Sequence, residues 1–210
     1  MLKNRQKKTE QRKSKAQSLV EFAITLPILL FLFSGMIEFG FALNYYLSML
    51  DATRVAARYY SNDTPFDEAT HADRMVFYSN TADMVVANLD PWVANHSYRG
   101  RRITLDPATD DVLVTVFGWS NDPAVGLMRY PTSGTYSIYH HGISRFADDA
   151  AITSKFPAGS PNAGLLVVEV HYNFHQVLGL PWLRPFLPDP LILRAYTIMP
   201  LSSAEPTSSP

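Results

Sequence analysis

Cysteine is absent from the 210 residues of this chain, and glycine occupies only 10 positions. Without cysteine the fold has no disulfide bond, and no thiolate can act as a nucleophile or a metal ligand. The sequence also lacks a glycine-rich phosphate loop and a Gly-x-Ser-x-Gly nucleophile elbow. These absences favour a non-enzymatic protein that has no cofactor and no small-molecule substrate, and that is stabilised by its hydrophobic core.

The chain carries almost no net charge, −1, but the charge is unevenly distributed. Residues 1–16 contain seven Lys or Arg and one Glu, whereas residues 17–210 contain 11 basic and 18 acidic residues. A polybasic stretch that precedes an apolar segment stays on the cytoplasmic side of a membrane. We therefore expect a cytoplasmic N-terminus and a body beyond the cell (inner or cytoplasmic) membrane.

A run of sixteen residues without charge, from Phe22 to Ile37, predicts a membrane-spanning helix. As a helix this run covers about 24 Å, which is less than a hydrocarbon core of about 30 Å. The apolar character resumes after Glu38 and continues to Leu43. A span over about 22–43 is complete if Glu38 lies near the outer interface.

The helical pattern does not stop at the predicted membrane boundary, because apolar residues recur at helical spacing as far as Tyr60. A secretory signal would instead end in a small-x-small cleavage site and a turn. We expect one nearly continuous helix over 17–60, on the order of 65 Å long. Pro27 lies inside it, where it bends the helix or removes one hydrogen bond.

Glu21 stands near the start of the apolar segment, and two interpretations of it are open. Ser18-Leu-Val-Glu21 has the pattern of a capping box, in which Ser18 caps the helix and Glu21 folds back on it. Alternatively, the carboxylate pairs with a cation from a partner. Such a partner is needed because placing a charged acid in lipid costs about 2.5–3.5 kcal/mol at the bilayer centre and less near its edge. A newly freed amino terminus would supply that cation.

The string from Ala16 to Leu30, AQSLVEFAITLPILL, resembles the TadE-like minor pseudopilins of tight-adherence (type IVb-like) pili. The resemblance extends over residues 16–60 through GMIEFG at 35–40 and DATRVAAR at 51–58. Ala16 and Gln17 form what resembles a prepilin processing site, with Glu21 at the fifth mature position. Such sites usually have Gly before the cut, where this chain has Ala16.

The resemblance implies that a prepilin peptidase removes residues 1–16 and that the helix then enters a pilus or its assembly platform. The implied partners are this peptidase, other pilin and pseudopilin subunits, the platform and the lipid membrane. Glu21, Phe22, Pro27 and Glu38 are the implied assembly contacts. The implied roles are pilus assembly, adhesion or secretion. The rival interpretation is a permanently anchored extracytoplasmic binding module that never enters a filament.

Residues 61–201 predict an exported domain of the α+β class. Thr64-Pro-Phe-Asp67 has the pattern of a helix start, and helical spacing continues to Pro91. After this second helix the period changes to two, which predicts an antiparallel sheet of about four to five strands. The predicted strands are 102–105, 112–117, 136–139, 165–174 and 191–198. Strand order stays open.

Three polar clusters in the body could suggest ligand sites, and each has a simpler structural interpretation. Glu169, His171 and His175 alternate along one strand face, where the two histidines are about 13 Å apart, so we interpret them as a solvated face and expect no metal. Asp106–Asp111 lacks the glycine and the closing Glu of a calcium loop, so we interpret it as a turn between strands. Arg99, Arg101 and Arg102 on an acidic body indicate a solvated edge, so nucleic acid is not an expected partner.

The segment from Leu178 to Pro190 contains four prolines, at 181, 185, 188 and 190, around Trp182 and Phe186. It fits neither a regular helix nor a central strand. Its aromatic side chains either cover the sheet edge, which we favour, or form a rigid apolar loop that contacts partner subunits or the membrane. Residues 202–210 are polar and rich in Ser and Pro, and we predict a disordered tail there.

Overall fold

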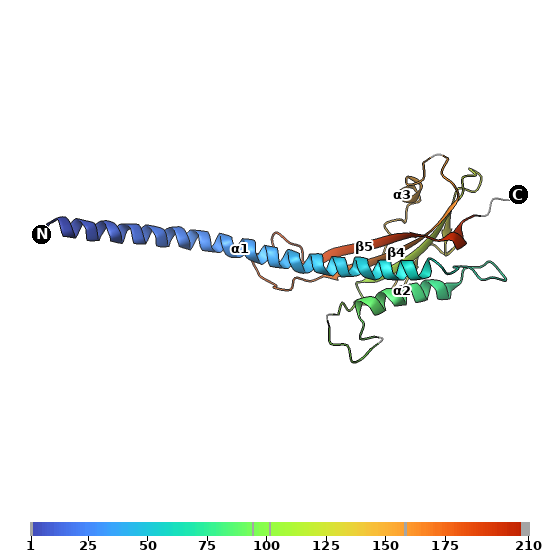
Figure 1. The fold of residues 1–210 in the computed structure, drawn as a ribbon, viewed down its shortest axis with the longest axis horizontal. Coiled ribbons are helices and arrows are strands. Elements are labelled where there is room, and N and C mark those ends of the chain that lie inside the picture. Colours follow the sequence, from blue (N-terminus) through green and yellow to red (C-terminus); the bar gives the residue numbers. More distant parts are fainter. Residues whose placement is uncertain (1, 94, 101, 158, 207–210) are drawn as a thin grey trace. The chain divides into compact units, whose positions relative to one another are not determined.

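The computed structural model describes residues 2–93, 95–100, 102–157 and 159–206, with side chains described from Gln17 onward. Figure 1 shows an α+β fold with one long N-terminal helix and an antiparallel sheet, which confirms the predicted class. The helices are α1 (Leu2–Tyr60), α2 (Met75–Leu89), α3 (Ala150–Thr153) and the 3-10 turn η1 (Ser202–Ala204), and the strands are β1 (Asp111–Trp119), β2 (Leu127–Tyr130), β3 (Tyr136–Ser137), β4 (Ala163–Phe174) and β5 (Leu191–Pro200).

The chain forms two compact units. The first contains Met1–Leu43 and His175–Leu191, and the second contains Asn44–Phe174 and Ile192–Pro210. We call them the anchor unit and the body. Helix α1 contributes to both, since its residues up to Leu43 belong to the anchor unit and its last turns belong to the body.

The body is built on a five-stranded sheet in the order β2-β1-β4-β5, with β3 also paired to β1. Strands β1 and β4 form the longest antiparallel ladder, from Asp111 opposite His171 to Trp119 opposite Ala163. Both central strands are rich in β-branched residues, which pack well on a pleated surface. They are buried on both faces, so each face of the sheet needs a cover.

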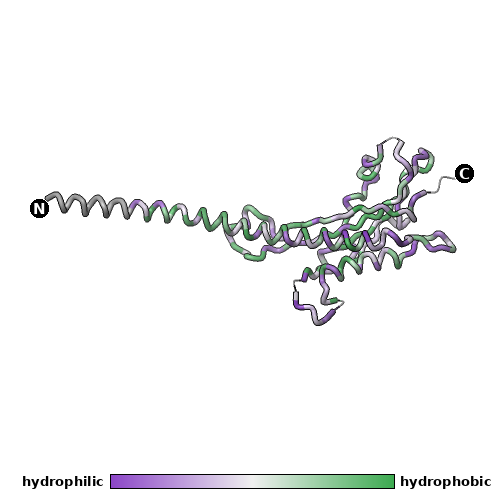
Figure 2. The backbone as a smooth tube through the Cα atoms, viewed as in Figure 1, coloured by the Kyte–Doolittle hydropathy of each residue, from purple (hydrophilic) through white to green (hydrophobic). Residues whose placement is uncertain are grey.

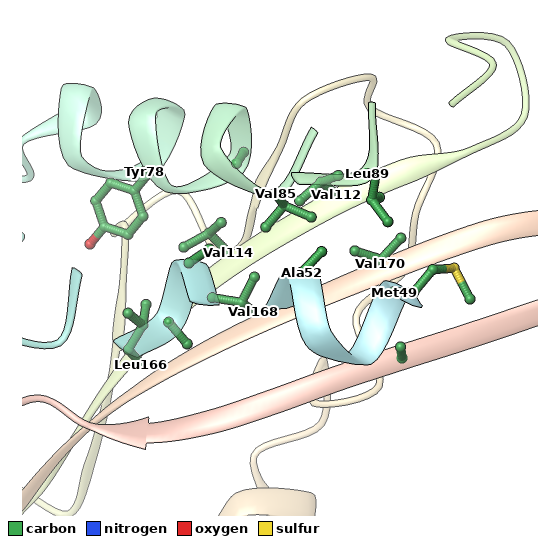
Figure 3. Close-up of a cluster of buried hydrophobic side chains, with 14 of the residues drawn as sticks. Met49, Ala52, Tyr78, Val85, Leu89, Val112, Val114, Leu166, Val168 and Val170 are labelled. Atoms are coloured by element: carbon green, nitrogen blue, oxygen red, sulfur yellow. The ribbon is translucent and has the colours of Figure 1, made fainter. Parts of the chain in front are cut away.

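The last turns of α1, together with α2, cover one face. Figure 3 shows side chains from both helices directed at the inward-facing residues of β1 and β4. Met49 and Ala52 of α1 and Val85 of α2 meet Val114 and Val168 in this cluster. Alternation along the strands places every second residue on this face, as the period of two predicts.

A second, smaller cluster covers the opposite face and corrects one prediction. Phe117, Phe146 and Val167 are among its buried members. On the same strand face Glu169 and His171 are buried rather than solvated. The Glu169 carboxylate accepts a short hydrogen bond from the Ser144 hydroxyl and another from the Arg145 N–H at 2.9 Å. The segment around Ser144 therefore covers the face that the polar alternation alone assigned to water.

Asp111 is the first residue of the central strand β1, and it fixes the segment that follows β3. Its carboxylate accepts hydrogen bonds from the Ser137 hydroxyl (2.6 Å) and from the backbone N–H groups of Tyr139, His141 and Gly142 (3.1, 2.9 and 2.6 Å). Burial by itself would raise the pKa of Asp111, but these donors outweigh it and lower that pKa. The turn predicted at 106–111 thus ends in a buried carboxylate that organises the chain after β3.

The predicted start of the second helix at Thr64 is wrong, because α2 begins at Met75. The Asp67 carboxylate accepts the N–H groups of Ala69 and Thr70 (3.1 and 3.0 Å) and so closes a turn. An aspartate that bonds its own following backbone competes with helix formation. Arg74 then pairs with Asp63 at 2.5 Å, which ties the ends of this loop together.

Other element boundaries also differ from the predictions. Residues 102–105 form no strand, and the Ile103 N–H instead bonds the Leu89 carbonyl (2.9 Å) at the end of α2. Strand β3 is only two residues long, and β2 and α3 were not predicted. The predicted tail begins instead with η1, where Leu201 and Ala204 are buried in the core. Residues 207–210 of that tail lie outside the described part of the chain.

Candidate membrane and assembly surface

The anchor unit presents an apolar helix surface. Among the described residues, Gln17–Tyr60 is a helix long and apolar enough to cross a membrane, by length and composition. Figure 2 shows hydrophobic colouring along much of its first half. Large apolar side chains such as Phe22, Leu32 and Met36 are exposed there. This surface requires an apolar environment that the chain itself does not supply.

Glu21 is exposed on this helix, and its carboxylate has one described side-chain contact, the Gln17 amide at 3.1 Å. The predicted capping box is wrong for the full chain. Helix α1 begins at Leu2 and runs through Ser18, so no helix start exists there for Ser18 to cap. The interpretation that remains for Glu21 is a carboxylate open to a partner.

Two more of the predicted assembly contacts, Phe22 and Pro27, lie on exposed positions of the same helix. Gln17 and Phe22 are exposed, and α1 continues through Pro27 without ending. Proline has no N–H, so the helical hydrogen bond to the Ala23 carbonyl is missing. Ala16 is in the helical backbone, but its side chain lies outside the described residues. The predicted processing site thus falls within α1.

Glu38 differs from Glu21 because its carboxylate is 2 % exposed and has backbone partners. It accepts the N–H of Val177 at 2.6 Å and that of Leu178 at 3.0 Å. These residues begin the proline-rich segment, which we call the strap (residues 175–190). Glu38 therefore holds the strap against α1, in place of the predicted contact with another subunit.

The strap packs on α1, so the prediction that its aromatic side chains cover the sheet edge is wrong. The Phe186 ring meets the Phe31 ring edge-on, with centroids 5.0 Å apart. The Trp182 indole N–H donates to the Ser34 hydroxyl at 3.3 Å. Trp182 and Phe186 each keep much of their surface exposed, so both side chains can also contact a further molecule.

The strap has its own internal contacts. The Gln176 amide donates to the Leu187 carbonyl at 3.0 Å, and His175 Nδ1 lies 3.0 Å from an Asp189 carboxylate oxygen. Between these closures Leu183 is buried, and its carbonyl accepts the N–H groups of Phe186 and Leu187, each at 3.0 Å. These contacts give the strap a defined conformation without strand or helix.

An apolar groove of about 730 Å³ lies between α1 and the strap, within the anchor unit. Its lining residues are Ala23, Leu26, Pro27, Leu30, Phe31, Trp182 and Phe186. Pro27, Trp182 and Phe186, which the sequence singled out, therefore meet at one place. Glu21 and Glu38 are not part of this lining.

The remaining polar candidates have structural roles. Arg102 pairs with Asp90 at 2.6 Å and lies over the Trp92 ring, as does Arg99, while Arg101 lies outside the described residues. Within the residues that the structure describes, no group of three or more His, Asp or Glu side chains could hold a metal ion. The exposed apolar helix and the groove in the anchor unit have the geometry of an interaction surface.

Residues 16–58 match the family model described as TadE-like protein. This N-terminal segment is TadE-like. The resemblance seen in the sequence is thereby confirmed over these residues, and the family that it names is a structural one, associated with tight-adherence pili. The apolar helix in the same segment is compatible with single-pass anchoring. No curated protein and no solved structure matches the chain significantly.

The sequence did not pair Glu38 with the strap. The two are about 140 residues apart, and hydrogen bonds to backbone N–H groups depend on no particular side chain in the strap. A signal was nevertheless present, since an acid within an apolar helix requires a partner. The TadE-like segment ends at residue 58, so the strap lies outside the matched region.

Proposed function

We propose that this chain is a minor pseudopilin of a tight-adherence pilus, cut by a prepilin peptidase after Ala16 and acting in pilus assembly. The observation that carries the proposal is the TadE-like match over the segment that contains the proposed cut and the exposed apolar helix. The seven basic residues among positions 1–16 keep this end in the cytoplasm, where the peptidase acts. The body then lies on the far side of the membrane.

Cleavage gives Gln17 a free amino group four positions before Glu21. In the uncut chain the Glu21 carboxylate has only the neutral Gln17 amide beside it among its described side-chain contacts. A carboxylate in a low-dielectric surrounding gains most from an opposite charge. Glu21 therefore pairs with the mature amino terminus of a neighbouring subunit, while Phe22 and the groove at Pro27 provide the apolar contact.

The intact mass of the chain tests the processing step. The full chain is produced in cells with an active prepilin peptidase, and the mature protein is expected to begin at Gln17. Ala16→Gly is expected to be cut equally well, whereas Ala16→Leu and an inactive peptidase leave residues 1–16 in place. A wild-type chain that keeps residues 1–16 beside an active peptidase would instead favour the permanently anchored module.

Incorporation into filaments tests the role of Glu21, by comparing sheared pili with the membrane fraction. Glu21→Gln keeps a hydrogen-bonding group but removes the charge, and we expect incorporation to fall at least tenfold with normal membrane insertion. Gln17→Ala removes the local amide contact but keeps both the charge and the new amine, so incorporation is expected to continue. Equal incorporation of Glu21→Gln and wild type contradicts the pairing.

A further inference from the structure

We propose that the strap, residues 175–190, dips into the outer leaflet of the lipid bilayer beside α1 and forms a second membrane attachment. This inference rests on the membrane anchoring in the proposed function. Its occupant is lipid, because the strap lies against the part of α1 whose apolar side chains are exposed over Gln17–Leu43. The strap continues that surface with Val177, Trp182 and Phe186, all exposed.

The depth follows from the contacts with α1. A complete span places Glu38 near the outer interface, and the strap is fastened there by the hydrogen bonds to Val177 and Leu178. Trp182 reaches Ser34, about 6 Å further along the helix, and Phe186 reaches Phe31, about 10 Å further. Interfacial segments insert to about 5–10 Å, and Trp prefers this region.

An irregular backbone at this depth must have its polar groups satisfied by the protein. Four positions of the strap are proline and carry no N–H, which removes four donors. Glu38 accepts two further N–H groups, and the Leu183 carbonyl accepts two more. The strap is therefore built to lower the cost of placing non-helical backbone against lipid.

The charged side chains of the strap also fit this placement. Arg184 is exposed, and its long side chain can extend from an apolar level to the headgroups. His175 and Asp189 contact each other at the two ends of the strap, where the chain enters and leaves it. Charge is thus kept at the rim, and Trp182 and Phe186 provide the apolar tip.

Spin labelling tests the proposal, because the chain has no cysteine and one can be introduced alone. Phe186→Cys is compared with Ile143→Cys in the body, two sites of similar exposure, 72 % and 75 %. Each full chain carries one nitroxide and is reconstituted in phosphatidylcholine vesicles. Flotation of the vesicles first confirms anchoring, and collision rates with oxygen and with a water-soluble nickel chelate then report depth.

We expect the oxygen-to-nickel collision ratio at position 186 to exceed that at position 143 at least fivefold. Adding Glu38→Ala to the Phe186→Cys chain is expected to lower the ratio toward the body value, because the strap loses its fastening. If the chain floats with the vesicles but the oxygen-to-nickel collision ratios are equal at both sites, the proposed insertion of the strap is overturned, whereas the anchoring by α1 is not. Low collision rates with both reagents at position 186 would mean that protein covers the label, which also overturns the proposal. A chain that fails to float with the vesicles would contradict the membrane anchoring on which the proposal rests.

Discussion

Residues 17–43 of α1, in the anchor unit, and residues 44–60, in the body, both carry apolar side chains but meet opposite surroundings. Met36 in the anchor unit is 70 % exposed, whereas Met49, less than four turns later, is fully buried in the body. Burial of apolar side chains in the body stabilises its fold, since about 25 cal/mol is gained per Å² removed from water. The same chemistry in the anchor unit contributes nothing until lipid or another subunit covers it. Hydrophobicity alone therefore does not distinguish an anchor from a core.

The sharpest way to break this comparison is to truncate the same residue type in each half of the molecule. Phe77→Ala empties a fully buried site and is expected to lower the free energy of unfolding of the body by about 3–5 kcal/mol. Phe33→Ala removes an exposed ring and is expected to change it by less than about 0.5 kcal/mol. Urea unfolding of the full chain in detergent micelles, followed by near-UV circular dichroism, measures both. Equal losses would mean that the anchor unit folds cooperatively with the body.

Acid is expected to destabilise the body without releasing the anchor unit from the membrane. The hydrogen bonds from Arg102, with help from Thr104, lower the pKa of Asp90 to about 2 although burial opposes them. An unfolded aspartate titrates near pH 3.9, so the pair's stabilisation is complete above about pH 4 and is lost as the pH falls toward 2. The melting temperature of the body should fall over this range while the chain stays with vesicles.

Asp90→Asn serves as the test of that assignment. It should lower the melting temperature at neutral pH and make its fall between pH 4 and 2 shallower. Asp51→Asn, at a well-exposed site on α1, is the control and should leave the pH profile unchanged. A wild-type melting temperature that is flat between pH 4 and 2 contradicts the role of the Asp90 carboxylate.

The two glutamates of the anchor unit offer a comparison within one helix. Glu38 accepts two strap N–H groups, and hydrogen bonds to a charged acceptor contribute about 1.5–3 kcal/mol. Glu38→Ala should therefore accelerate hydrogen exchange at Val177 and Leu178 at least tenfold. Glu21→Ala should not change exchange at either position, because its only described side-chain contact is with Gln17. Unchanged exchange in Glu38→Ala would show that other contacts hold the strap.

The smallest effect is expected on the water-facing side of α1 within the body. Arg54 and Asp51 form an exposed pair at 3.6 Å, one helical turn apart. Arg54→Ala should change the free energy of unfolding by less than about 0.5 kcal/mol, since solvent screens such pairs. The same urea titration measures it, and a loss above 1 kcal/mol would reveal a contact beyond this pair.

The periodicity of apolar residues predicted the long helix and the main strands, where each face of an element keeps the same surroundings along its length. The apolar run and its continuation at helical spacing to Tyr60 predicted α1 from residue 17 onward but not its start at Leu2, and the branched residues of β1, β4 and β5 indicate strands. The start of α2 was misplaced because Thr64 and Asp67 suit both a helix cap and a turn. Only the contacts of Asp67 with Ala69 and Thr70 decide between these two.

The candidate site was predictable residue by residue but not as an arrangement. Trp182, Phe186 and Pro27 each stood out in the sequence, yet their meeting in one groove depends on how the chain returns to α1 after β4. Glu169 and His171 show the same limit in the body. Their alternation marks a polar face, but a segment from elsewhere in the sequence covers it and supplies Ser144 as a partner.

The core of the body joins residues that lie far apart in the sequence, and this bears on the timing of synthesis. Met49 in α1 and Leu201 next to η1 belong to one buried cluster, and the Leu201 N–H bonds the Gly164 carbonyl at 2.8 Å. Contacts separated by about 150 residues form late, because closing so long a loop costs conformational entropy before the contact stabilises the fold. A nascent chain therefore cannot complete this core until Leu201 has been made, and one that ends before Leu201 leaves the cluster open to proteases.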